Sequence, residues 1–153
     1  MVRKGNGKNP VAKRINIVAL KLVKESSILY KERSIRSPED SYTLLKDFLG
    51  DKDREYFVVV SLNTKNQPVS INVCHIGCLN SSIVHQREVM KSAILSNAAS
   101  IIIAHNHPSG ETTASREDLE VTKRLVDSGK LMGIELLDHL IIGDGKFTSL
   151  KEK

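Results

Sequence analysis

The sequence predicts an α/β protein of the α+β type, with helices flanking a mixed β-sheet. Short β-rich apolar runs alternate with segments whose apolar residues recur at helical spacing. Some consecutive runs are separated only by turn-forming residues, which join antiparallel strands. Others are separated by a helix, as parallel neighbours require. A sheet that contains both kinds of neighbour is mixed.

Size and composition favour one globular domain. The chain has 153 residues, of which 40% are hydrophobic and 27% charged, which is neither a disordered nor a membrane-spanning composition. No apolar run has the length of a membrane span or the pattern of a signal peptide. Two cysteines, Cys74 and Cys78, cannot build a disulfide framework. We therefore expect a cytoplasmic protein.

The first half of the chain predicts four elements. Alternating residues over 15–23 predict a strand. Ser37 as N-cap and Pro38 at the first helical position predict a short amphipathic helix that ends before Gly50. The β-rich runs 56–62 and 69–76 predict a hairpin.

The second half predicts two further helices and three strands. A helix is expected over 85–96, followed by a short, mostly apolar run over 100–104 that is typical of a buried central strand. The next helix is expected over 115–128. Strands over 134–142 and 146–150 are joined by Gly-Asp-Gly, which indicates a hairpin.

The charge is unevenly distributed. Residues 1–36 contain ten Lys or Arg and two Glu, a net charge of +8, whereas the remaining 117 residues carry −3. We divide the chain into a basic, unstructured arm over 1–14 and a domain over 15–153. The arm could contact DNA or another acidic partner. The alternative is a solvated leader, since the arm has no aromatic residue on which bases could stack.

The residues that indicate chemistry begin with His105 and His107. Two histidines at i and i+2 on an extended strand project to the same side, so both imidazoles can reach one metal ion. Asp118 follows eleven positions after His107, at the start of the next helix. Two imidazoles and a carboxylate suit Zn²⁺, and three protein ligands leave a fourth position for water, as in catalytic sites.

Two further residues complete a hydrolytic site. Glu55, at the head of the strand over 56–62, is the best candidate for the base that moves the proton of the attacking water. Ser115 could donate a hydrogen bond to the oxyanion. The spacing of Ser115 and Asp118 also fits a capping box, in which Asp118 only caps its helix.

Together these residues resemble a known family. His105-x-His107-Pro108, Ser115-x-x-Asp118 and an upstream Glu are similar to the JAMM motif of MPN+/JAB-domain metalloproteases. Within that superfamily, five segments over residues 15–151 closely resemble the bacterial RadC-like branch: SPED at 37–40, REV at 87–89, NAA at 97–99, HNHPSG at 105–110 and LDHLIIG at 137–143.

The resemblance implies a JAB/MPN fold, which is similar to that of cytidine deaminases, and one zinc ion per chain. It makes His105, His107 and Asp118 the zinc ligands, Glu55 the general acid/base and Ser115 the oxyanion helper. It implies a metallopeptidase that cleaves a peptide or isopeptide bond of a protein substrate by attack of zinc-bound water. Longer RadC-like proteins carry a helix-hairpin-helix region typical of DNA binding, and the family is historically linked with DNA repair.

Other functions fit the sequence less well. The letters His-Asn-His do not make an HNH nuclease, whose motif residues are dispersed, and the Cys pattern of a zinc deaminase is missing. Cys74 and Cys78 fit ordinary structural positions. Alternation puts Asp138 and His139 on opposite faces of their strand, so one of them could line the pocket, although structural positions are the preferred interpretation for both. The second hypothesis for function is a DNA-associated interaction module whose zinc is structural or vestigial. The sequence does not determine the substrate or the oligomeric state.

Overall fold

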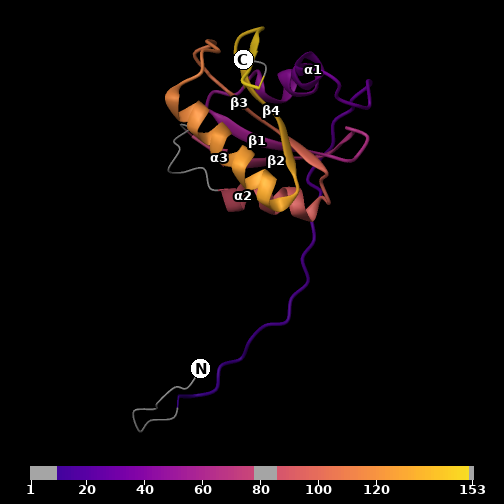
Figure 1. Ribbon diagram of the computed structural model, residues 1–153, viewed down its shortest axis with the longest axis vertical. Coiled ribbons are helices and arrows are strands. Elements are labelled where there is room, and N and C mark those ends of the chain that lie inside the picture. Colours follow the sequence, from indigo (N-terminus) through magenta and orange to yellow (C-terminus); the bar gives the residue numbers. More distant parts are fainter. Residues whose placement is uncertain (1–9, 78–85, 152–153) are drawn as a thin grey trace.

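A computed structural model describes residues 10–77 and 86–151 of the chain (Figure 1). Five strands form one sheet in the order β2-β1-β3-β4-β5, in which β3 and β4 are parallel and the other neighbours antiparallel. The sheet is therefore mixed and the predicted fold class is confirmed. The elements are α1 (Pro38–Leu49), β1 (Tyr56–Leu62), β2 (Pro68–Ile76), α2 (Gln86–Leu95), β3 (Ser100–Asn106), α3 (Arg116–Met132), β4 (Glu135–Ile142) and β5 (Phe147–Ser149).

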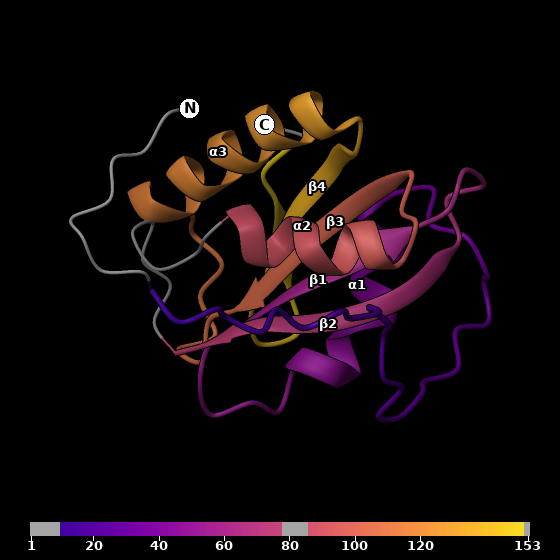
Figure 2. The same ribbon diagram turned by 90° about the horizontal axis from the view of Figure 1, so that it is seen from below.

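Helices cover both faces of the sheet. Helix α1 lies on one face and helices α2 and α3 on the other, as Figure 2 shows. Each face has its own apolar cluster, because alternate residues of the central strands point to opposite sides. The α2/α3 side contains Phe57, Val59, Ile101 and Ile103, and the α1 side contains Val58, Val60, Ile102 and Ala104.

Helix α3 is longer than predicted. The expected helix ended at residue 128, but α3 continues through Gly129 to Met132 and ends at Gly133, whose φ of 71° is left-handed. Gly129 is needed for packing and does not end the helix. A Cβ at this position would lie 2.2 Å from the backbone oxygen of Ile134, so glycine lets the chain return closely to begin β4.

The predicted strand over residues 15–23 is wrong. Residues 10–37 contain no helix or strand, and the first part of this segment extends away from the sheet (Figure 1). Ile15 and Ile17 are 84% and 101% exposed. Alternation reports how side chains would face if a strand formed, but a strand also needs a neighbour for its backbone groups. The segment pairs with none of the five strands.

The other predicted elements are confirmed with small shifts at their ends. Residue 85 of the predicted helix over 85–96, and most of the basic arm over 1–14, lie outside the described residues. Among the described helices none is long and apolar enough to cross a membrane.

Candidate metal centre

Strand β3 positions both histidines. It lies in the middle of the sheet and all seven of its residues are buried. His105 is opposite Phe57 of β1, and its ring lies on the α2/α3 side, where it is fully buried. His107 follows the end of the strand, and its backbone N–H still donates to the carbonyl oxygen of Ile142 at 2.9 Å. The two rings therefore lie on one side, as the i, i+2 spacing predicts.

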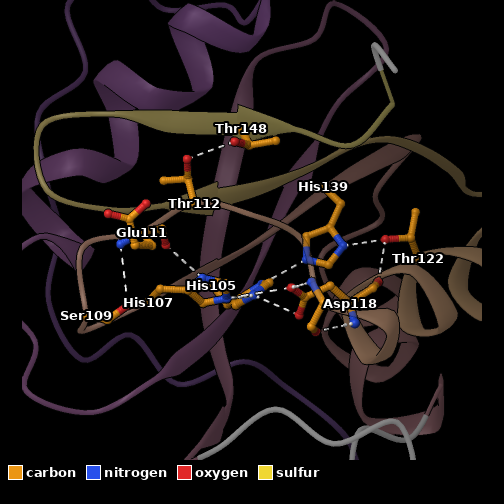
Figure 3. A network of polar contacts seen from close by, with 10 residues as sticks. His105, His107, Ser109, Glu111, Thr112, Asp118, Thr122, His139 and Thr148 are labelled. Carbon is orange, nitrogen blue, oxygen red and sulfur yellow. Dashed lines mark hydrogen bonds and ion pairs between the residues drawn. The ribbon is translucent and has the colours of Figure 1, made fainter.

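Helix α3 brings Asp118 to the histidines. Ser115 is the N-cap of this helix, and its Oγ accepts from the backbone N–H of Asp118 at 3.1 Å. In return, Asp118 Oδ2 accepts from the backbone N–H of Ser115 at 2.8 Å. The capping box is thus present, but it does not exclude Asp118 as a metal ligand. Asp118 Oδ1 also lies 3.1 Å from Nε2 of His105, so the box fixes the orientation of the carboxylate beside the rings (Figure 3).

The three side chains fit a single metal ion. Nε2 of His105 and Nε2 of His107 are 3.1 Å apart, and Nε2 of His107 is 3.6 Å from Asp118 Oδ2. Ligand bonds of about 2.0–2.1 Å in a tetrahedron place neighbouring ligand atoms about 3.3 Å apart. Among the described residues, these are the one group of three or more His, Cys, Asp or Glu that could hold a metal ion.

Charges within this cluster are coupled. Burial opposes ionisation of Asp118, but hydrogen bonds from His105 and His107 outweigh it and hold the pKa of the carboxyl well below its usual range. The hydrogen bond with Asp118 in turn raises the pKa of His107, against desolvation by burial. The site therefore holds an ionised carboxylate beside two imidazoles, a set of donors that suits a cation.

Further contacts orient the two imidazoles. Nδ1 of His107 donates to the backbone oxygen of Glu111 at 2.8 Å, which leaves Nε2 for the metal. Nδ1 of His105 lies 2.9 Å from Nε2 of His139 on β4. His139 is fully buried, and this burial lowers its pKa well below the ordinary value, so the ring is neutral.

The sequence does not predict the contact between His139 and His105. Alternation along β4 predicts that Asp138 and His139 face opposite sides of the sheet. The structure agrees, since Asp138 accepts from Ser149 Oγ at 2.7 and 2.9 Å, whereas the His139 ring contacts His105. No spacing along the chain connects His139 to His105, because their strands, β4 and β3, are neighbours only in the sheet. The one available signal was a histidine within an apolar parallel strand.

Glu55 is brought to the cluster by Asn106. The Asn106 side chain accepts from the backbone N–H of Tyr56 at 2.7 Å and donates to the carbonyl of Arg54 at 2.9 Å. These are the backbone groups on either side of Glu55. The Glu55 carboxylate contributes to the raised pKa of His107, which places it within electrostatic reach of that ring. Asn106 therefore fixes the backbone around Glu55 next to the histidines, a contact that periodicity along the sequence does not predict.

An open cleft of about 570 Å³ borders the cluster. Glu55, Ser115, His107 and Asp118 all line it, so four of the five predicted site residues share this cleft, and His105 is buried behind it. The Ser115 hydroxyl accepts the capping bond through an oxygen lone pair, which leaves its hydrogen free to donate into the cleft. The remaining lining residues are Asp53, Arg54, Gly77, Pro108 and Ser109.

The loop between His107 and α3 is fixed to the β4–β5 hairpin. The backbone N–H of Asp144 donates to the Gly110 carbonyl at 3.1 Å, and Thr148 donates to Thr112 at 2.9 Å (Figure 3). Gly143 packs closely here, because a Cβ on it would lie 2.2 Å from the Gly110 oxygen. The loop that delivers Asp118 is therefore anchored near its start.

Cys74 plays no part in this centre. It is half-buried on β2, and desolvation by burial raises the pKa of its thiol to about 12, so it remains protonated. Its predicted neighbour Cys78 lies outside the described residues.

Known proteins are similar to most of this chain. The family model described as RadC-like JAB domain matches residues 35–153. UPF0758 proteins of Moorella thermoacetica and Bacillus cereus are 59% identical over 119 residues and 58% identical over 125 residues, which is 78% and 81% of this chain. A UPF0758 protein of Methanosarcina mazei is 46% identical over 149 residues, 97% of this chain.

The chain spans 52%, 56% and 65% of the length of the Moorella, Bacillus and Methanosarcina relatives, respectively. The family match covers all five strands and three helices, and it includes Glu55 and the three residues of the candidate metal centre. This chain therefore belongs to the RadC-like JAB domain family.

Proposed function

We propose that this protein is a zinc-dependent hydrolase that cleaves a peptide or isopeptide bond. The observation that carries the proposal is the arrangement at one cleft. Two imidazoles and a carboxylate that could hold a metal ion lie beside a further carboxylate, Glu55, that is not part of the cluster. Catalytic zinc sites typically combine three protein ligands with a separate carboxylate base.

Each residue has a distinct part in the proposed reaction. When bound, zinc supplies Lewis-acid chemistry, which polarises the amide carbonyl and makes water a nucleophile near neutral pH. Glu55 takes the proton of that water and delivers it to the leaving amine nitrogen. Ser115 donates a hydrogen bond to the carbonyl oxygen as charge develops on it. The capping box holds Ser115 and Asp118 in fixed positions relative to each other during these steps.

The openness of the site suits a chain-like substrate. Exposed residues, including Asp53, Arg54 and Ser109, border the cleft, whereas His105 lies at 0% exposure behind it. A peptide or a lysine side chain in isopeptide linkage can lie along such a border and place one amide next to Glu55. Substrate specificity would then depend on side chains at this border.

The first test is metal content. Elemental mass spectrometry on protein purified without chelators or a His tag should find about one zinc per chain. The His105→Ala variant should lose it and the Glu55→Gln variant should keep it. If the parent contains no metal, and takes up none when zinc is supplied, the hydrolase proposal fails.

The second test is turnover of fluorogenic peptide and lysine-isopeptide pools. We expect Glu55→Gln to lose activity by at least about 100-fold, the usual contribution of a general acid/base. Asp51→Asn is the matched control, because Asp51 is an exposed acid four residues away that does not line the cleft. Equal turnover in the parent and Glu55→Gln would contradict the assigned role.

The alternative function is a DNA-associated interaction module. It draws on the exposed basic segment, in which residues 10–29 contain four Lys or Arg and one Glu. If this hypothesis is correct, removal of residues 1–14 abolishes DNA binding that has a steep salt dependence, while Glu55→Gln changes nothing. The two hypotheses therefore differ in which variant is inactive.

A further inference from the structure

A series of hydrogen bonds connects His105 to Asp118 on the side of these candidate metal ligands that faces away from the cleft. Nδ1 of His105 contacts Nε2 of His139 at 2.9 Å, and Nδ1 of His139 contacts the Thr122 hydroxyl at 2.5 Å. The same hydroxyl lies 2.9 Å from the backbone oxygen of Asp118. His139 comes from β4 and Thr122 from α3, one turn after Asp118. The series thus connects two ligands through two side chains that do not touch the cleft (Figure 3).

The direction of each hydrogen bond follows from its chemistry. A carbonyl oxygen only accepts, so the Thr122 hydrogen must lie between the two oxygens and point at Asp118. The Thr122 oxygen then accepts from His139, which places the ring hydrogen of His139 on Nδ1. His139 is fully buried and its two ring nitrogens face only a hydroxyl and another imidazole, surroundings that favour a ring with a single hydrogen. With that hydrogen on Nδ1, Nε2 of His139 accepts from Nδ1 of His105. When a metal ion is bound, Nε2 of His105 consequently presents its lone pair to that ion, in place of the contact with Asp118 Oδ1 that it makes in this structure.

We propose that Thr122 and His139 are positioning residues that hold His105 in the tautomer whose Nε2 can bind the metal. The proposal rests on the metal site of the proposed function, not on hydrolysis. His107 reaches the same state by a simpler route, since its Nδ1 donates directly to the Glu111 carbonyl. At His105 the acceptor is itself a tautomeric ring, so the state of His105 depends on the hydroxyl of Thr122.

The test compares two substitutions at position 122. Thr122→Val keeps the shape of the side chain and removes the hydroxyl, whereas Thr122→Ser keeps the hydroxyl. Zinc affinity is measured by competition with a chelator. We expect Thr122→Ser to match the parent and Thr122→Val to bind zinc about 10- to 100-fold more weakly, the usual effect of losing a group that orients a ligand.

A second readout separates hydrogen-bond direction from a merely structural effect. Long-range ¹H–¹⁵N spectra report which ring nitrogen carries the hydrogen. In the parent and in Thr122→Ser we expect His139 to carry it on Nδ1, and in Thr122→Val this preference is lost. His139→Phe, which fills the space without an acceptor, should weaken zinc binding as Thr122→Val does.

Two results would overturn the positioning role. One is a His139 ring that carries its hydrogen on Nε2 in the parent. The other is equal zinc affinity in the Val and Ser variants. The outcome is separate from that of the proposed function. Zinc binding that follows Thr122 without any peptidase turnover leaves the positioning role standing and removes only the hydrolase, whereas a parent that binds no zinc overturns both.

Discussion

At the residue scale, the site depends on short polar side chains that hold backbone groups of distant segments. Asn106 is the clearest example. Its amide bonds the peptide groups on both sides of Glu55, at Tyr56 and Arg54, which lie fifty and fifty-two positions earlier in the chain. Asn106 is 3% exposed, so water does not compete effectively for these bonds. The position of the proposed base is therefore set by a neighbour of the histidines.

We expect Asn106→Ala to lower turnover while zinc stays bound. A displacement of about 1 Å in a catalytic group can cost about 100-fold in rate. The matched control is Asn63→Ala at the other end of β1, where Asn63 Oδ1 accepts from the backbone N–H groups of Lys65 and Gln67. Steady-state kinetics with zinc-loaded protein make the comparison. If the two variants have the same turnover, Asn106 does not position Glu55.

The ionic coupling of Asp118 and His107 predicts a pH window. The depressed pKa of Asp118 stabilises the metal-free fold above pH 3.8, and this contribution is lost as pH falls further. The raised pKa of His107 stabilises it below pH 6.5, and that contribution is lost as pH rises through the folded pKa. We expect the deficit of Asp118→Asn in denaturant unfolding to be largest between these limits. A deficit that is independent of pH would contradict the coupling.

Ser115 has two roles, as helix cap and as proposed donor to the oxyanion, and a pair of variants can separate them. Ser115 and Ser37 are both N-caps whose Oγ accepts a helix N–H, at 3.1 and 3.3 Å. Replacement of either by Ala should cost about 1 kcal/mol of stability. Only Ser115→Ala should also lower turnover, by about 100-fold, if its hydroxyl acts on the oxyanion. Thermal unfolding and kinetics on both variants give the comparison, and equal turnover would leave Ser115 as a cap alone.

At the element scale, the site is built where three elements converge. Strand β3 brings the histidines, the first turn of α3 brings Asp118, and the β4–β5 hairpin anchors the loop between them. Helix and strand alone would not fix the loop. The anchoring works because Gly110 and Gly143 permit the two backbones to approach closely.

We expect Gly143→Ala to displace this loop. The new Cβ would lie 2.2 Å from the Gly110 oxygen and 2.6 Å from Cγ2 of Thr112. Overpacking of this kind costs about 1–3 kcal/mol, and zinc affinity should fall because Asp118 moves with the loop. Gly145→Asn in the same hairpin is the control, since nothing lies within 4 Å of it and Asn tolerates its φ of +67°. Unchanged zinc affinity in Gly143→Ala would show that the anchor is dispensable.

At the scale of the whole molecule, stability comes from two apolar layers on either side of one sheet. Within the described part of the segment before Tyr30, residues 10–29, no residue belongs to either layer. We expect a variant that begins at Tyr30 to unfold within about 0.5 kcal/mol of the parent. Leu45→Ala, which empties a fully buried position on α1, should instead cost about 2–5 kcal/mol. A truncated protein as unstable as Leu45→Ala would show that the segment contributes to the fold.

The sequence by itself determined the fold class, the helices and strands from Pro38 onward and the cluster of His105, His107 and Asp118. These follow from local physics, because caps, alternation and the i, i+2 spacing act over a few residues. Only the tertiary structure decided that residues 15–23 form no strand. Strand formation depends on a pairing partner, which no local pattern reports. Tertiary structure also decided that Asn106 holds Glu55 and that His139 faces His105, since sheet neighbours meet across thirty to fifty residues of chain.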